Sequence, residues 1–405
     1  MTPGPRSSYL KQLMLWFLLL LVGAALVNLV VDPYALFGTP RITGLSQIKP
    51  ASANRLRISK PYQVRRNQPR ALVGGNSRPE MGIDPGHVCW PDDMRPVYNL
   101  GLPGVGVYRQ ARTLQHASYR SDVVLILWGL DFADFLSSRH AYDNMPWPPG
   151  KREYEDGLVV NADGTENSDY ALTRFQTYLK TLVSLDTLVD SLETVFQQDN
   201  PYSSNRLDNG FNPARDYISI IRSEGQQVLF QQKNREIEKR FSGEGLTIFS
   251  EHENSSEEFM SLEHLLSSMA RQNIQVYLFI NPYHIDYLSA IYRNGLWNDF
   301  ELWKLQLAKI ANRYHVPIWD FSIITRYNTE PSPRSEAGGK TLDWFWEPAH
   351  YKREVGDMML ETMLPDWCRK TLAEPVGIQL DLKSIDMVLE KERIKVESMS
   401  RKEAL

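Results

Sequence analysis

The sequence predicts an α/β protein built on a parallel β-sheet that helices cover on both faces. Continuous apolar runs of strand length recur along the chain, at residues 71–73, 122–131, 274–280 and 316–320. Such runs are typical of strands that are buried on both faces. Segments with helical spacing separate the runs, as expected where crossover helices join parallel strands.

Composition supports a globular domain of ordinary chemistry. The chain has 405 residues, of which 42% are hydrophobic and 11% aromatic, enough to bury a substantial core. A net charge of -4 argues against a nucleic-acid-binding protein, which normally presents a strongly basic face. Only Cys89 and Cys368 are present, so a disulfide scaffold and a cysteine metal cluster are excluded, and one bridge between the two stays open.

The amino terminus carries an apolar segment long enough to cross a membrane. Residues 13–31 are uncharged, and about 19 residues at 1.5 Å each span roughly 28 Å. Arg6 and Lys11 precede this run and no basic residue follows until Arg41, which predicts a cytoplasmic amino terminus. A cleaved signal peptide is the alternative, but the run is long for one and no small-x-small cleavage site follows it.

These features predict a chain of several parts. The order is a cytoplasmic stretch at 1–11, a transmembrane anchor at 12–32, a proline-rich tether at 33–70, an α/β domain at 71–375 and a charged helical tail at 376–405. Crossover and flanking helices are expected over 108–119, 257–272, 297–313 and up to about 363.

A long insertion at about 137–255 interrupts the α/β domain. Helical spacing runs through residues 172–196 and again through 217–241. Insertions at the carboxyl edge of such a sheet often shape a ligand pocket. The insertion is therefore either a lid or a plain structural subdomain.

A candidate nucleophile follows the first strand. Gly74 and Gly75 permit a sharp turn after residues 71–73 and leave Ser77 exposed at the carboxyl end of the sheet. A serine needs a base, and His350 lies on a turn before a helix with Glu347 three residues earlier. We expect Glu347 to orient the imidazole and His350 to take the serine proton.

Four short blocks stand at predicted strand or turn ends. They are Gly75-Asn76-Ser77-Arg78, Asn99-Leu100-Gly101-Leu102-Pro103-Gly104, Gly129-Leu130-Asp131 and Glu347-Pro348-Ala349-His350. In this order they resemble the SGNH/GDSL hydrolase superfamily, over residues 70–135 and 274–363. The resemblance is closest to a divergent membrane-anchored branch associated with bacterial envelope or exopolysaccharide assembly.

The resemblance implies a flavodoxin-like three-layer α/β/α sandwich and ester chemistry through an acyl-serine. Ser77 would be the nucleophile, His350 the base and Glu347 its acidic partner, in a slot more often held by aspartate. The oxyanion hole would take the backbone N–H groups of Ser77 and Gly104 and a side chain of the third block. There Asp131 replaces the usual asparagine, and an ionised carboxylate repels an oxyanion.

Further residues are candidates for substrate binding. Asn99 belongs to the glycine block, and Arg78 either binds an acidic substrate group or pairs with Asp131. His284 lies just beyond the strand 274–280. There it either binds substrate, acts as the base or makes a structural turn. An alternative is a metal site, although no known ligand spacing supports it. Its ligands would be Asp131, Asp134, His284, Glu347 and His350. We expect no metal and no cofactor.

The sequence thus predicts a single-pass inner-membrane protein with a periplasmic domain. Its expected activity is that of a serine esterase or O-acetyltransferase on acyl groups, acetyl above all, of an envelope polysaccharide. Its partners would be that acylated polysaccharide or an acyl donor, the membrane and a polysaccharide assembly protein, but no nucleic acid. The alternative is a catalytically silent glycan-binding or scaffold protein that keeps the fold.

Overall fold

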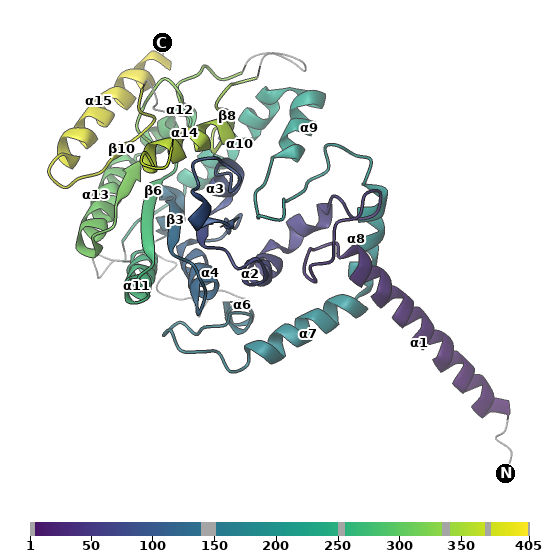
Figure 1. Ribbon diagram of the computed structural model, residues 1–405. Helices are drawn as coiled ribbons and strands as arrows, with labels where there is room; N and C mark the ends of the chain where they lie inside the picture. The colour runs from purple at the N-terminus through teal and green to yellow at the C-terminus, as the bar shows by residue number, and fades with distance from the viewer. Residues whose placement is uncertain (1–4, 139–150, 250–255, 334–340, 369–373, 404–405) are drawn as a thin grey trace.

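The computed structural model describes residues 5–138, 151–249, 256–333, 341–368 and 374–403, and its centre is a six-stranded sheet. The strand order is β10-β7-β6-β3-β1-β2 (Figure 1). The strands are β1 (Ala71–Gly74), β2 (Val97–Asn99), β3 (Leu125–Leu130), β6 (Gln275–Ile280), β7 (Ile318–Asp320) and β10 (Ile378–Gln379). All neighbours are parallel except β10, which is antiparallel to β7. The predicted α/β class with a mostly parallel sheet is confirmed.

The central strands β1, β3 and β6 are buried on both faces, because their successive side chains enter two different cores. Leu72, Ile126 and Trp128 belong to the larger core, whereas Val73 and Leu127 belong to the smaller one. This alternation follows from the two-residue period of a strand. It explains why the strands read as continuous apolar runs in the sequence.

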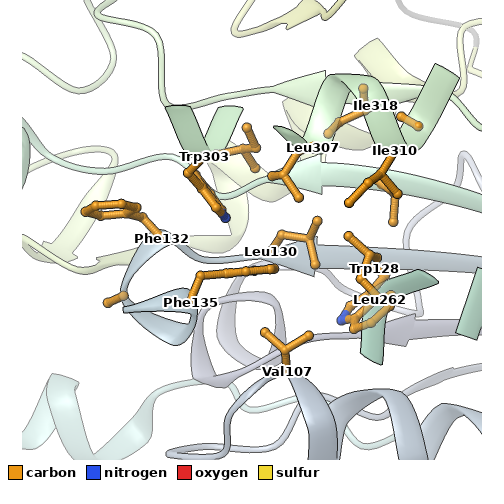
Figure 2. Packing of buried hydrophobic residues seen from close by; sticks show 14 of the residues in the cluster. Val107, Trp128, Leu130, Phe132, Phe135, Leu262, Trp303, Leu307, Ile310 and Ile318 are labelled. Atoms are coloured by element: carbon orange, nitrogen blue, oxygen red, sulfur yellow. The ribbon is translucent and has the colours of Figure 1, made fainter. Parts of the chain in front are cut away.

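Helices pack against both cores. The larger core receives residues from, among others, α4 (Val107–Ser118), α11 (Glu257–Arg271), α12 (Ile285–Arg293), α13 (Trp297–Tyr314) and α15 (Ile385–Glu403). Figure 2 shows its centre, where the rings of Phe132 and Phe135 each lie 5.6 Å from that of Trp303. The smaller core is closed by α14 (Arg353–Met363), and α3 (Ser77–Gly82) contacts α14.

Residues 50–67, which the sequence analysis assigns to the tether, form regular structure. They make a 3-10 helix, η1 (Pro50–Arg55), and then α2 (Leu56–Asn67), which packs against α4. Tyr62 and Val64 of α2 are buried. The helix is hard to recognise in the sequence because it contains Pro61 and has few apolar residues.

The insertion consists of short helices and one small strand pair. Its described elements are β4 (Ser137–Ser138), α6 (Lys151–Asp156), α7 (Tyr170–Val183), α8 (Leu185–Phe196), α9 (Arg215–Glu224), α10 (Gln226–Phe241) and β5 (Leu246–Thr247). Each predicted helical stretch is divided in two, at Ser184 and at Gly225. Residues 139–150 and 250–255 of the predicted insertion lie outside the described residues.

The amino-terminal helix α1 (Pro5–Val31) projects from the rest of the molecule (Figure 1). Its part from Tyr9 to Val31, 23 residues, is long and apolar enough to cross a membrane by length and composition. Only its carboxyl-terminal end is in contact with the domain, through α7 and α8.

Candidate functional site

Ser77 lies in the first turn of α3, directly beyond the carboxyl end of β1. Gly75 makes this turn with a φ of +131°, and a Cβ at this position would press on the Gly129 carbonyl oxygen, so glycine is required. Asn76 caps the helix, because its Oδ1 accepts a hydrogen bond of 3.0 Å from the Arg78 N–H. The turn leaves the Ser77 side chain partly exposed.

Ser77, His350 and Glu347 form a continuous hydrogen-bonded relay. The Ser77 Oγ lies 2.7 Å from the His350 Nε2, although 273 residues separate the two in the chain. The His350 Nδ1 is hydrogen-bonded to the Glu347 Oε1. A carboxylate can only accept, so Nδ1 carries the proton and Nε2 is free to accept from the serine hydroxyl. This is the arrangement that activates a serine in a serine–histidine–acid triad.

Glu347 is held as a buried carboxylate. Burial acts to raise its pKa, but the interaction with His350, with smaller contributions from the charge of Lys233 and the Ala349 N–H, brings the pKa below its usual value. The Ala349 N–H donates to Oε2 at 2.6 Å. On the other side, the Tyr217 hydroxyl of α9 donates to Oε1 at 3.4 Å. Tyr217 is a site residue that the sequence gives no means to find, because it comes from the insertion.

Glu347 and His350 lie on a two-stranded hairpin, β8 (Phe345–Glu347) and β9 (His350–Tyr351). Gln226 at the start of α10 holds this hairpin by donating to the Phe345 carbonyl at 2.8 Å. From the nucleophile's side, the Arg78 Nε donates to the Ala349 carbonyl at 2.5 Å. The insertion and α3 therefore fix the imidazole from opposite sides.

Two glycines let α3, which begins at Ser77, approach α14, which follows His350. A Cβ on Gly356 of α14 would overlap the carbonyl oxygen of Gly82 at the end of α3. A Cβ on Gly82 would overlap the ring of Tyr351, next to His350. The close contact thus depends on the absence of side chains at both positions.

A disulfide bond joins the same two regions. Cys89 follows α3 and Cys368 follows α14, and the two sulfurs are bonded across a sequence separation of 279 residues. The pairing that the sequence analysis leaves open is therefore present in the structure. It ties the segment that carries Ser77 to the segment that carries His350.

Arg78 and Asp131 form a buried ion pair, one of the two alternatives predicted for Arg78. The Asp131 Oδ1 also accepts from the Ala133 N–H at 3.0 Å and caps α5 (Phe132–Phe135), while Oδ2 accepts from the Asn76 Nδ2 at 3.2 Å. A guanidinium and two N–H donors thus surround this carboxylate. The Asp131 oxygens therefore accept hydrogen bonds from neighbouring groups of the protein and do not act as donors to an oxyanion.

The two candidate residues of the glycine block, Asn99 and Gly104, lie in different surroundings. Asn99 is fully buried, and its Nδ2 donates to the carbonyls of Pro79 and Ile83 at 2.8 Å each, so that it fastens α3 to the sheet. Gly104 lies exposed beyond β2 with a φ of +64°, and its carbonyl accepts from the Arg57 guanidinium at 3.1 Å. Of the two, only Gly104 is open to solvent.

His284 is the N-cap of α12 and lies next to the β8–β9 hairpin. Its Nδ1 accepts from the Asp286 N–H at 3.2 Å and its Nε2 lies 2.8 Å from the Glu330 carbonyl, so both ring nitrogens are engaged by backbone. Its own backbone N–H donates to the Pro348 carbonyl at 3.1 Å. These contacts are those of a residue that supports the turn before His350, and they differ from the contacts expected of a base.

A buried charge network lies beneath the nucleophile. Glu80 of α3, three residues after Ser77, binds the Lys60 Nζ at 2.9 Å and the Arg206 Nη2 at 3.2 Å. Burial acts to raise the pKa of Glu80, but Lys60 and Arg206 together hold it below its usual value. The network joins α2, α3 and the insertion, and the sequence signals only that Glu80 is close to Ser77.

Within the described residues, no three histidine, cysteine, aspartate or glutamate side chains gather in a way that suits a metal ion. No protein-family model matches the chain, and no curated protein matches it. The resemblance to SGNH hydrolases stays a prediction that rests on the four sequence blocks.

Proposed function

We propose that this protein is a membrane-anchored serine esterase or O-acyltransferase of the SGNH type. The observation that carries the proposal is the relay from the Ser77 Oγ through His350 to the buried Glu347. The parallel strands follow the order β2-β1-β3-β6-β7, which is the flavodoxin-like order 2-1-3-4-5. This order agrees with the architecture that the resemblance implies.

In the proposed reaction, the Ser77 oxygen attacks the carbonyl carbon of an ester while His350 Nε2 takes the hydroxyl proton. The resulting imidazolium is stabilised by the Glu347 carboxylate. Collapse of the tetrahedral intermediate breaks the bond to the alcohol, which leaves with the proton from His350. Water or a sugar hydroxyl then attacks the acyl-serine by the same route, and the choice of acceptor distinguishes hydrolysis from transfer.

The negative oxygen of the intermediate needs hydrogen-bond donors, and each is worth about 10²–10³ in rate. We propose the backbone N–H groups of Ser77, at the start of α3, and of Gly104. Asp131 has no part in this hole, because its carboxylate pairs with Arg78. In this chain its role is to position the loop around the nucleophile.

The proposed substrate is an acylated, most often acetylated, polysaccharide of the cell envelope, with the α/β domain outside the cytoplasmic membrane. The apolar helix α1 supports an anchored protein, and the resemblance supports the polysaccharide. The disulfide between Cys89 and Cys368 agrees with an oxidising compartment.

A serine-directed fluorophosphonate tests the proposal. The full chain in detergent is incubated with the reagent, beside Ser77→Ala and His350→Ala, and adducts are read by intact mass. We expect one adduct on wild type and none on either variant. No adduct on folded wild type, or the same adduct on Ser77→Ala, contradicts the proposal.

The ion-paired Asp131 favours a second candidate, a scaffold that binds glycan without turning it over. The two functions separate when wild type and Ser77→Ala are compared for binding and for release of acetate from an acetylated polysaccharide. Equal binding with release only by wild type supports the enzyme. Equal binding with no release by either supports the scaffold.

A further inference from the structure

The pair of helices α7 and α8 carries its apolar side chains on the outside. The exposed residues follow helical spacing in both helices and are Leu172, Phe175, Leu179 and Val183 in α7 and Leu185, Val189, Leu192 and Phe196 in α8. Intervals of three and four residues place each set on one face. Two adjacent helices that expose their large apolar faces in this way indicate a binding surface.

The buried residues of α8 are small and polar, whereas α7 packs inward through Tyr170 and Tyr178, which contact Tyr62, beside its threonines. Thr187, Ser191 and Thr194 of α8 are at most 2% exposed. In α7 the hydroxyls of Thr177 and Thr181 donate to the carbonyls four residues earlier, at 2.9 and 2.8 Å, within the helix. A helix packed on a domain in water normally buries its apolar face, so α8 has the reverse of the usual arrangement.

The end of α1 packs on this pair through a side chain that is unusual for its apolar sequence. The Asn28 Nδ2 donates to the carbonyls of Leu182 and Ser184 at 2.9 and 3.1 Å, and its Oδ1 accepts from the Ser191 hydroxyl at 3.0 Å. Asn28 is fully buried. Small and polar residues at a helix contact are typical of packing inside membranes.

Asn28 also fixes the depth of the pair along α1. It lies three residues before Val31, the end of the apolar segment, or roughly 5 Å along the helix axis. The turn between α7 and α8 is therefore held slightly inside the end of the segment that spans a bilayer. An amphipathic helix at the membrane boundary buries its apolar face by a similar depth, about 5–10 Å.

Charged side chains flank the apolar faces without interrupting them. Lys180 of α7 and Asp186 and Glu193 of α8 are exposed. At 100° per residue each lies to one side of its helix's apolar row. Helices at an interface have this arrangement, with the apolar face toward the acyl chains and the charges at headgroup level.

We propose that α7 and α8 lie in the boundary layer of the membrane that α1 crosses, with the eight apolar side chains among the lipid acyl chains. The occupant of this surface is the lipid bilayer, because the surface continues from the helix that spans it. The domain is then attached by three helices and held at a fixed orientation. The inference rests on α1 as a membrane span and is independent of the ester chemistry.

Spin labels on the full chain in nanodiscs of phosphatidylcholine and phosphatidylglycerol test this inference. Labels are placed by Phe175→Cys in α7 and Val189→Cys in α8, with Ile394→Cys in α15 as the matched control. The native positions are 63%, 62% and 61% exposed, and α15 lies far from α1 (Figure 1). The native cysteines are bonded to each other and do not react with the label.

We expect the labels at 175 and 189 to be several-fold more accessible to oxygen and several-fold less accessible to a water-soluble nickel chelate than the label at 394. Equal nickel accessibility at all three positions overturns the inference and leaves a partner protein as the occupant. Because a label reports its own surroundings, the result does not depend on activity. Circular dichroism confirms that each variant is folded.

Discussion

At the scale of single residues, the proposed role of Ser77 as a nucleophile depends on one buried carboxylate. Glu347 accepts from His350, from the Ala349 N–H and from the hydroxyl of Tyr217. Of these donors, His350 and the Ala349 N–H help to hold the pKa of Glu347 below its usual value in spite of its burial. An ionised Glu347 keeps the proton on Nδ1 of the imidazole, which is the tautomer that can receive the serine proton.

Replacing this carboxylate by an amide reverses the tautomer. In Glu347→Gln the side-chain NH₂ can donate to Nδ1, which moves the imidazole proton to Nε2. We expect fluorophosphonate labelling of Ser77 to slow by roughly 10³–10⁴-fold, measured as a rate by mass spectrometry. The exposed Glu354→Gln on α14 is the control and should label like wild type. A Glu347→Gln rate within a few-fold of wild type would exclude the relay.

Asp131 is predicted to matter for stability and not as a missing oxyanion donor. Asp131→Asn introduces the amide of the resembled family, but it leaves the buried Arg78 without its partner charge. We expect a loss of about 3–5 kcal/mol in the free energy of unfolding and no faster labelling. Urea unfolding of Asp131→Asn, Arg78→Gln and the double variant gives the coupling energy. Faster labelling with unchanged stability contradicts this assignment.

At the scale of elements, the site depends on how closely α3 and α14 approach. Helix α3 begins at Ser77, and helix α14 follows His350. The two helices touch through Gly82 and Gly356. Close packing of this kind transmits small displacements, because neighbouring atoms have no free space into which to relax.

Gly356→Ala should therefore affect both stability and reactivity. The added methyl collides with the backbone of Gly82, and such overpacking costs about 1–3 kcal/mol. We expect a lower melting temperature and slower labelling of Ser77. Gly243→Ala is the control, because a Cβ there makes only ordinary contacts of 3.4 Å or more and its φ is not positive. If both variants behave alike, the glycine contact has no special role.

The sequence predicts helices and strands well where burial produces a regular pattern of apolar residues. Strands β3, β6 and β7 lie within the apolar runs and β1 exceeds its run by one residue, while α4, α11 and α13 agree with the predicted helices to within one residue at each end. It predicts poorly where contacts are polar. Thus α2 is held by Lys60 and Gln63, which bond to distant carbonyls, and no local periodicity shows this.

The site shows the same division. Ser77, His350 and Glu347 are found from short local patterns, and the structure brings them together. Tyr217 and Arg206 reach the site from the insertion, and His284 and Asn99 turn to backbone groups. Which partner a polar side chain takes depends on distances across the fold that no spacing along the chain reveals.

At the scale of the whole molecule, one covalent bond joins the two halves of the site. A loop closed over 279 residues restricts the unfolded chain strongly. The Cys89→Ser and Cys368→Ser double variant should lose about 2–5 kcal/mol of unfolding free energy, read by urea unfolding. Wild type in dithiothreitol should behave alike, and the double variant in dithiothreitol should change no further. Equal midpoints for oxidised and reduced wild type contradict this prediction.

The order of residues along the chain determines when the disulfide can form during synthesis. On the proposed topology α1 and Ser77 cross the membrane early, and the residues that supply the base and the second cysteine emerge 273 and 279 residues after their partners. Until then the growing chain holds a serine without a base and a thiol without its partner. A polypeptide interrupted before residue 350 therefore lacks the base that the proposed reaction requires, and the bond forms only after Cys368 has followed Cys89 into the compartment where both sulfurs can be oxidised.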